Sequence, residues 1–228
     1  MTNIKNTAIL DSREKISKFD PDRALASAES LADQIHQVWQ ERKQIKFTPQ
    51  AIKSISKVMV AGMGGSALGA DVVLHLFKDR LTVPMTINRD YQLPNFVDSK
   101  TLVILSSYSG NTEEILACAK IAKLNKAQIA IISAGGKLSE IAEKNQYPRF
   151  LIKAKHNPSQ QPRMAIGYSI MAFISILSAA KLLKFEEKQL LEIIDVINQI
   201  TEKSKVEIPQ EENQAKLLAF LRLERRPI

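Results

Sequence analysis

The sequence predicts an α/β protein built on a parallel β-sheet of about five strands, with helices covering both faces. From residue 57 onward, short apolar runs alternate with helix-compatible segments, and strands without a polar side have to be buried on both faces. Two of these runs end in turns rich in glycine or serine, as strands that feed helices in such sheets often do. With 228 residues, 45% of them hydrophobic, the chain can bury a core of this size.

The elements of this sheet follow one another in regular order. Strands are expected at residues 58–61, 84–88, 101–106, 128–133 and 149–153, and helices at 67–78, 111–124 and 137–144. We therefore divide the chain into an N-terminal helical segment (1–50), the α/β domain (51–157), and a helical region and linker (158–228).

Helices are also expected on both sides of the α/β unit. Apolar residues recur at helical spacing over 22–42, with Asp20 as a plausible N-cap and Pro21 at the first helical position. Residues 164–180 carry no charge, but the stretch is slightly short for a membrane span and contains glycine and serines, which favours a buried core helix. Two polar-apolar helices end the chain, at 186–203 and 211–225, and Pro227 is expected to stop the second.

The composition is that of an ordinary globular protein and argues against several classes of partner and location. The net charge is +8, but lysines are scattered among glutamates and no basic run is interleaved with aromatic residues, so no nucleic-acid partner is expected. The lone cysteine, Cys118, excludes an internal disulfide and fits a reducing compartment. The first residues lack an apolar core of signal-peptide length, so we expect a cytoplasmic protein without a membrane partner.

The first turn of interest, after the strand at 58–61, has the sequence GMGGSALGAD (62–71). A strand that feeds a helix through glycines presents unpaired N–H groups and the positive end of the helix dipole, which together favour an anion. The segment also fits the dinucleotide pattern GxGxxG/A, and Asp90 after the next strand could bind a ribose. On these residues alone, a dinucleotide-dependent oxidoreductase is one hypothesis.

The second turn repeats this geometry but supplies hydroxyl groups. SSYSGNT (106–112) follows the third strand and opens a helix, and it brings Ser107, Ser109 and Thr112 together with free N–H groups. Several donors at one helix N-terminus suit a compact phosphate monoester, whereas a dinucleotide has no use for a second cradle. Serine, asparagine and threonine also cap helices without binding anything, so a purely structural turn is the alternative.

With these motifs the sequence resembles the sugar isomerase (SIS) domain, and within it the bifunctional phosphoglucose/phosphomannose isomerases. The segments that carry the resemblance run over most of the chain: FDPDRALASA (19–28), GMGGSALGAD (62–71), NRDYQLP (88–94), SYSGNTEE (107–114) and QPRMAIGY (161–168). The resemblance implies a SIS-type three-layer αβα sandwich, with no cofactor. No metal is expected either, because no cluster of His, Cys, Asp and Glu has ligand spacing.

The resemblance also implies roles for particular residues. Ser107, Ser109 and Thr112 would hold the phosphate of a hexose 6-phosphate. Gly65 and Ser66 would contact the sugar near the reacting carbons. Arg163 would stabilise the negative charge of the enediolate as glucose 6-phosphate or mannose 6-phosphate is converted to fructose 6-phosphate.

Catalysis of this isomerisation also needs a general base and a ring-opening group. In the family that this sequence resembles, a glutamate and a histidine in a second SIS subdomain supply them, and no counterpart of that subdomain is found here. We therefore expect a homodimeric enzyme half that binds the sugar phosphate with little or no turnover. The alternatives are a single-SIS regulatory module that binds a sugar phosphate without catalysis, and the oxidoreductase described above.

Overall fold

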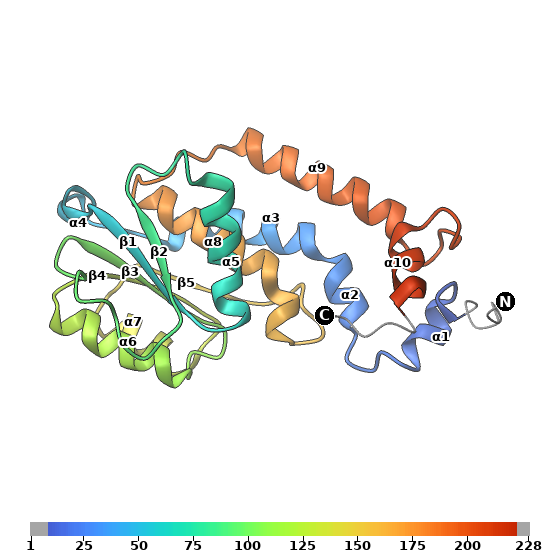
Figure 1. Ribbon diagram of the computed structural model, residues 1–228, viewed down its shortest axis with the longest axis horizontal. Helices are drawn as coiled ribbons and strands as arrows, with labels where there is room; N and C mark the ends of the chain where they lie inside the picture. Colours follow the sequence, from blue (N-terminus) through green and yellow to red (C-terminus); the bar gives the residue numbers. More distant parts are fainter. Residues whose placement is uncertain (1–8, 223–228) are drawn as a thin grey trace.

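The fold is organised around a five-stranded parallel sheet, with the strand order β2-β1-β3-β4-β5 (Figure 1). The structure is a computed structural model and describes residues 9–222. The strands are β1 (Lys57–Gly62), β2 (Met85–Asn88), β3 (Thr101–Ser107), β4 (Gln128–Ser133) and β5 (Arg149–Leu151). The expected α/β class, the parallel sheet and the number of strands are confirmed.

Helices cover both faces of the sheet, which makes a three-layer αβα sandwich. On one face α5 (Gly65–Phe77) and α8 (Ile166–Ala179) lie against the strands, and α3 (Leu31–Glu41) packs on α8. On the other face lie α6 (Glu113–Leu124) and α7 (Gly136–Lys144) (Figure 1). Alternate residues of β1 and β3 point into two separate apolar cores, as fully buried parallel strands require.

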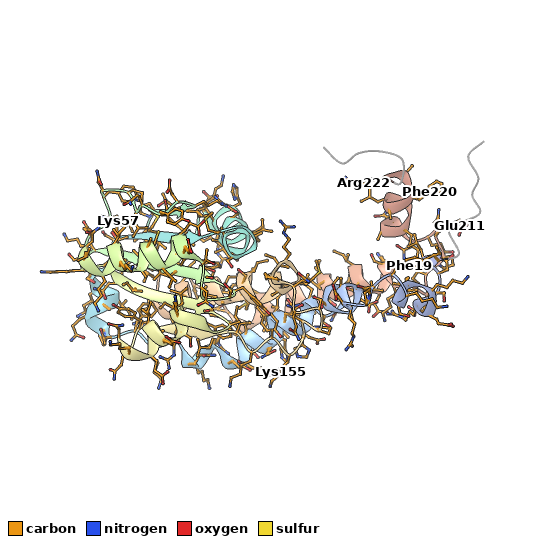
Figure 2. The ribbon with its side chains drawn as sticks, turned by 90° about the horizontal axis from the view of Figure 1, so that it is seen from below. Phe19, Lys57, Lys155, Glu211, Phe220 and Arg222 are labelled. Carbon is orange, nitrogen blue, oxygen red and sulfur yellow. The ribbon has the colours of Figure 1, made fainter. Side chains whose placement is uncertain are left out.

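The remaining helices are short, except for one that leads away from the sheet. They are α1 (Arg13–Ser17), α2 (Ala24–Glu29), the 3₁₀ helix η2 (Arg42–Gln44), α4 (Pro49–Ser54), the 3₁₀ helix η3 (Pro162–Ala165), α9 (Glu187–Ser204) and α10 (Gln214–Arg222). The long helix α9 runs from the sandwich to an arm formed by α1 and α10. Figure 2 shows Phe19 and Phe220 in this arm, away from the sheet.

The expectation of one continuous helix over 22–42 is wrong. The segment is divided at Ser30 into α2 and α3, and Arg23 lies before α2 with φ = 60°. The side chain of Asp20 does cap this segment, accepting hydrogen bonds from the N–H groups of Ala24 at 2.8 Å and Leu25 at 2.9 Å. The helix nevertheless begins after Pro21, which does not hold its first position.

The uncharged stretch at 164–180 is confirmed as a core helix. The segment Pro162–Ala179 has a mean hydropathy of 1.3, and 61% of it is buried inside the protein. It becomes η3 and α8, and α8 packs between α3, α5 and the sheet. The last expected helix is α10, which begins at Gln214, and Pro227 lies outside the described residues.

Candidate functional site

The two turns singled out from the sequence lie side by side at the carboxyl ends of β1 and β3. The chain leaves β1 for α5 on one face of the sheet and leaves β3 for α6 on the other. Because β2 lies on one side of β1 and β3 on the other, the direction of the strand order changes here. In open parallel sheets, ligands bind in the crevice at such a switch point.

The first turn is built by Gly62, Gly64 and Gly65. A Cβ atom on Gly62 would lie 3.2 Å from backbone atoms of Ala67, so the strand and the helix approach each other closely. Gly64 has φ = 49°, in the region that disfavours side chains. The turn therefore depends on glycine for its shape.

This turn offers fewer free N–H groups than the sequence predicts. The amide of Ser66 donates to the carbonyl of Met63 at 3.0 Å, and that of Ala67 donates to Gly64 at 3.2 Å. The expectation of several unpaired donors at the start of α5 is wrong for these two residues. An anion would find fewer partners here than at an uncapped helix start.

The second turn gathers three hydroxyl groups. The Oγ of Ser107 lies 2.7 Å from Oγ1 of Thr112 and 3.4 Å from Oγ of Ser109, and it accepts a hydrogen bond from the amide of Gly110 at 3.1 Å. Ser107 is buried, Thr112 is half-buried and Ser109 is exposed. The cluster therefore runs from the interior of the protein to its surface.

The start of α6 lies directly beside these hydroxyls. Thr112 is the N-cap residue of α6, but its side chain makes no capping hydrogen bond. In the described part of the chain, the N–H groups of Glu113, Glu114 and Ile115 receive no capping bond from the Thr112 side chain. As first-turn amides, they also have no carbonyl partner within the helix. Hydroxyls and first-turn amides together form a donor set suited to an anion with several oxygens.

A third turn, which the sequence patterns did not indicate, supports this hydroxyl cluster. A Cβ atom on Gly110, where φ is 69°, would lie 1.8 Å from the carbonyl oxygen of Gly135. A Cβ atom on Gly136, where φ is 64°, would lie 2.4 Å from the carbonyl oxygen of Ser109. The side chain of Asn111 also accepts a hydrogen bond from the amide of Lys137 at 3.1 Å. The Gly-Gly pair at the start of α7 was the signal that could have revealed this contact.

Arg163 is brought to the first turn by η3. A Cβ atom on Gly65 would lie 3.6 Å from Cγ of Arg163 and 3.8 Å from the carbonyl oxygen of Pro162. The side chain of Arg163 is exposed, and among the described residues its guanidinium forms no ion pair. A permanent cation therefore lies next to the glycine turn, available to an anionic or developing negative group.

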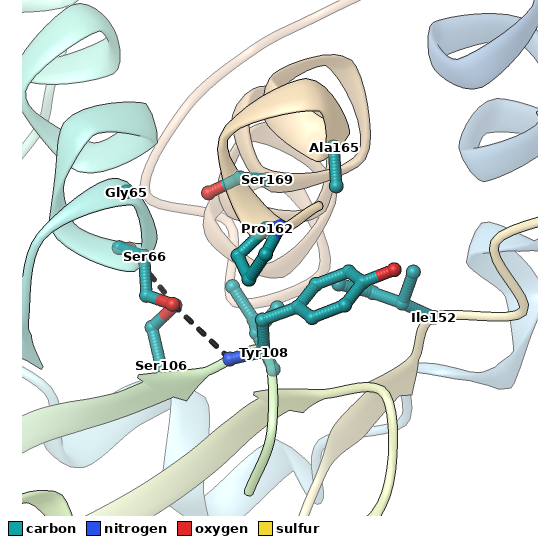
Figure 3. A pocket seen from close by; sticks show the side chains of 9 residues that line it. Gly65, Ser66, Ser106, Tyr108, Ile152, Pro162, Ala165 and Ser169 are labelled. Atoms are coloured by element: carbon teal, nitrogen blue, oxygen red, sulfur yellow. Dashed lines mark hydrogen bonds between the residues drawn. The ribbon is translucent and has the colours of Figure 1, made fainter. Parts of the chain in front are cut away.

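A narrow pocket lies where η3 approaches the two turns (Figure 3). Ser66, Tyr108 and Pro162 line it, and the ring of Tyr108 extends below Pro162. The Tyr108 hydroxyl accepts a hydrogen bond from Nδ2 of Asn157 at 3.3 Å. Tyr108 could not be identified from the sequence, because a tyrosine between two serines carries no pattern of its own.

Asp90, the proposed ribose ligand of the oxidoreductase hypothesis, belongs to a different local arrangement. Its carboxylate accepts a hydrogen bond from the amide of Tyr91 at 2.5 Å, and its carbonyl accepts one from Nδ2 of Asn88 at 3.0 Å. It follows β2, which is an edge strand here, whereas the dinucleotide-binding strand order continues beyond the second strand. The topology therefore differs from that of the dinucleotide fold.

Comparison with known proteins identifies the protein family. The family model of the SIS domain matches residues 51–182, and the chain belongs to this family. A solved structure, the Vibrio vulnificus NanR protein complexed with ManNAc-6P, has the same fold, with a TM-score of 0.52 and 15% identity over 77% of this chain and 67% of that one.

Among curated proteins, the chain is similar to bifunctional phosphoglucose/phosphomannose isomerases. It is 39% identical to the one from Caldicellulosiruptor bescii over 202 residues, which are 89% of this chain and 58% of the relative. It is 34% identical to the one from Thermoplasma acidophilum over 68% of this chain and 47% of the relative. The chain thus spans about half the length of these relatives.

Proposed function

We propose that this chain forms the part of a hexose-phosphate isomerase that binds the phosphate and the reactive end of the sugar. The observation that supports this most is the donor set at the second turn, where the hydroxyls of Ser107, Ser109 and Thr112 adjoin the uncapped start of α6. A phosphate monoester has three terminal oxygens and needs this many donors at once. The similarity to phosphoglucose/phosphomannose isomerases points to hexose 6-phosphates as the ligands.

The two turns divide the substrate between them in this proposal. With the phosphate at the start of α6, the sugar extends along the crevice toward Gly65 and Ser66. Arg163, whose Cγ lies near Gly65, then faces the carbons that react. Its charge would stabilise the enediolate oxygens while a proton moves from C2 to C1 between aldose and ketose.

The base that removes the C2 proton is not among the residues we place in this site. We expect it, and the group that opens the sugar ring, to come from the portion of the isomerase relatives that this chain does not match. The 228-residue chain alone should then bind fructose 6-phosphate and turn it over slowly or not at all. Robust turnover by this purified chain would contradict this assignment.

Calorimetric titration with fructose 6-phosphate and NAD in parallel tests the proposal against the oxidoreductase alternative. We expect the sugar phosphate to bind and the dinucleotide to be without effect. Binding of NAD without binding of fructose 6-phosphate would instead favour the oxidoreductase alternative.

Thr112→Val, which removes one hydroxyl and keeps the shape of the side chain, should weaken binding of the sugar phosphate about 10-fold.

We also propose a cytoplasmic homodimer. The single cysteine, which is buried and free, fits a reducing compartment such as the cytoplasm. The dimer is suggested by the apolar residues Val196 and Ile200 on α9, which are more than half exposed, at 54% and 60%. Light scattering after gel filtration would measure the mass. A mass of about 51 kDa, twice the 25.5 kDa of one chain, supports the dimer, and a mass of one chain contradicts it.

A further inference from the structure

Two glutamine side chains of α3 are buried in the sandwich. Gln34 is 0% exposed and Gln37 is 7% exposed. Burying a carboxamide is costly unless its donors and acceptor are all hydrogen-bonded, so their partners indicate what these residues do.

Gln34 binds the backbone of the segment that carries Arg163. Its Nε2 donates to the carbonyl oxygens of Met164 at 2.8 Å and His156 at 2.9 Å. Its Oε1 accepts a hydrogen bond from the amide of Gly167 at 3.2 Å. One side chain thus holds the backbone directly after Arg163 and, through His156, the loop that leads into η3.

The fit around Gln34 is close. A Cβ atom on Gly167 would lie 2.9 Å from Cβ and 3.0 Å from Oε1 of Gln34. The first turn of α8 can therefore approach α3 only because residue 167 is glycine. This close approach brings α3 against the first turn of α8, which directly follows η3.

A second set of hydrogen bonds holds the same loop nearer to the end of β5. Gln37 donates to the carbonyl of Lys153 at 2.7 Å and accepts from the Tyr168 hydroxyl at 2.7 Å. The Tyr168 hydroxyl in turn accepts from the amide of His156 at 2.9 Å. The loop is therefore anchored to α3 at several points, and Gln34 is the anchor nearest to Arg163.

We propose that Gln34 is a positioning residue that sets the location of Arg163 against the sugar end of the site. This inference rests on the proposed function, since it assigns Arg163 to the sugar. It places the N-terminal helices, which the SIS domain match at 51–182 does not include, within the architecture of the site. Gln34 touches no substrate in this proposal and acts only through the backbone around Arg163.

The test compares two ligands on the 228-residue chain carrying Gln34→Met, an apolar replacement of similar length. In the proposed site, fructose 6-phosphate would contact both ends, whereas inorganic phosphate would contact only the hydroxyl cluster around Ser107. We expect the affinity for fructose 6-phosphate to fall about 10-fold and the affinity for inorganic phosphate to change by less than about twofold. Gln40→Met, an exposed position on the same helix, is the matched control and should change neither.

A double variant separates positioning from general loss of structure. In the Arg163→Ala background, Gln34→Met should weaken fructose 6-phosphate binding by less than about twofold, because the group that it positions is gone. An equal loss of affinity for both ligands would overturn the inference. So would a full loss of about 10-fold in fructose 6-phosphate affinity in the Arg163→Ala background. Gly167→Ala, which crowds Gln34 from α8, should reproduce the selective loss if Gln34→Met does not fold.

Hydrogen–deuterium exchange tests the anchor without any ligand. Gln34→Met should speed exchange over residues 156–167 and leave β1, β3 and β4 unchanged. Unchanged exchange at 164–167 would overturn the inference whatever the ligands do. Failure of the wild-type chain to bind fructose 6-phosphate would instead overturn the proposed function, and the exchange measurement would still report on the anchor.

Discussion

The hydroxyl of Ser66 accepts a hydrogen bond from the backbone amide of Tyr108 at 3.1 Å, which joins the two turns at the carboxyl ends of β1 and β3 (Figure 3). A second bond runs the other way, from Oγ of Ser106 to the carbonyl of Ser66 at 3.0 Å. The phosphate and sugar ends proposed for the site are therefore parts of one hydrogen-bonded unit.

Ser66→Ala removes the acceptor of the Tyr108 amide and a hydroxyl that we place against the sugar. We expect the affinity for fructose 6-phosphate to fall roughly 5- to 30-fold, which corresponds to about 1–2 kcal/mol. Isothermal titration calorimetry would measure it, with the exposed Ser99→Ala as the control. Unchanged affinity in Ser66→Ala would remove this residue from the site.

Ser107→Ala should affect both stability and binding. The Ser107 hydroxyl is bonded to Thr112 and to the amide of Gly110, so its loss leaves two polar groups without this partner. We expect the free energy of unfolding to fall by about 1–3 kcal/mol and the affinity for inorganic phosphate to fall about 10-fold.

Ser109→Ala is the comparison for Ser107→Ala. Ser109 is exposed, so its variant should keep wild-type stability within about 0.5 kcal/mol while still losing phosphate affinity. Denaturant unfolding and phosphate titration of the two variants would separate the effects. Equal destabilisation by both variants would contradict the difference in burial.

Gly110→Ala should disrupt the hydroxyl cluster, because the new methyl group would lie 1.8 Å from the carbonyl oxygen of Gly135 at a positive φ of 69°. We expect a loss of about 3 kcal/mol or more in the free energy of unfolding, together with loss of phosphate binding. Gly135→Ala is the matched control, since no atom lies within 4 Å of its Cβ position. A stable, phosphate-binding Gly110→Ala variant would show that the two turns do not pack as described.

The arm that carries α1 should loosen in acid. Glu207 accepts hydrogen bonds from Nε of Arg13 at 2.5 Å and Nη2 at 3.1 Å, and these bonds lower the pKa of Glu207 from 4.5 to about 2. Because the carboxylate is favoured in the folded state, the stabilisation is present above pH 4.5 and is lost as the pH falls through about 2.

An NMR titration of the Glu207 carboxyl carbon would measure this pKa directly. The midpoint should lie near 2 in the wild-type chain and return toward 4.5 in Arg13→Gln. Because both side chains are largely exposed, about 1 M salt should also raise the midpoint by screening the pair. A wild-type midpoint at 4.5 would contradict the ion pair.

The regular part of the fold could be predicted from local patterns. The strand expected at 128–133 is β4 with the same bounds, because its residues are apolar and β-branched and are bounded by turns. The hydroxyls of Ser107, Ser109 and Thr112 were also predicted together, since adjacent residues of one turn need no tertiary information. The position of both turns at the same edge of the sheet could be predicted too, because the carboxyl ends of parallel strands share one edge.

Contacts between distant segments could not be predicted. The pattern over 22–42 did not reveal that Gln34 and Gln37 are buried, because their partners are carbonyls of a loop about 120 residues away in the chain. The division of that helix at Ser30, whose Oγ donates to the carbonyl of Ala26 at 2.9 Å, is likewise not visible in the helical spacing, which continues across it. Tyr108 was missed because its role in the pocket comes from η3, which the sequence places far from it.

The most direct test of the central claim is an NMR titration of the isotope-labelled chain with fructose 6-phosphate. We predict that the largest amide shifts occur at Glu113, Glu114 and Ile115, where the phosphate would lie, and next at Gly65 and Ser66, where the sugar would lie. Inorganic phosphate should shift only the first group. Shifts confined to Gly65 and Ser66, or no saturable shift at either turn, would contradict the placement of a sugar phosphate across the two turns.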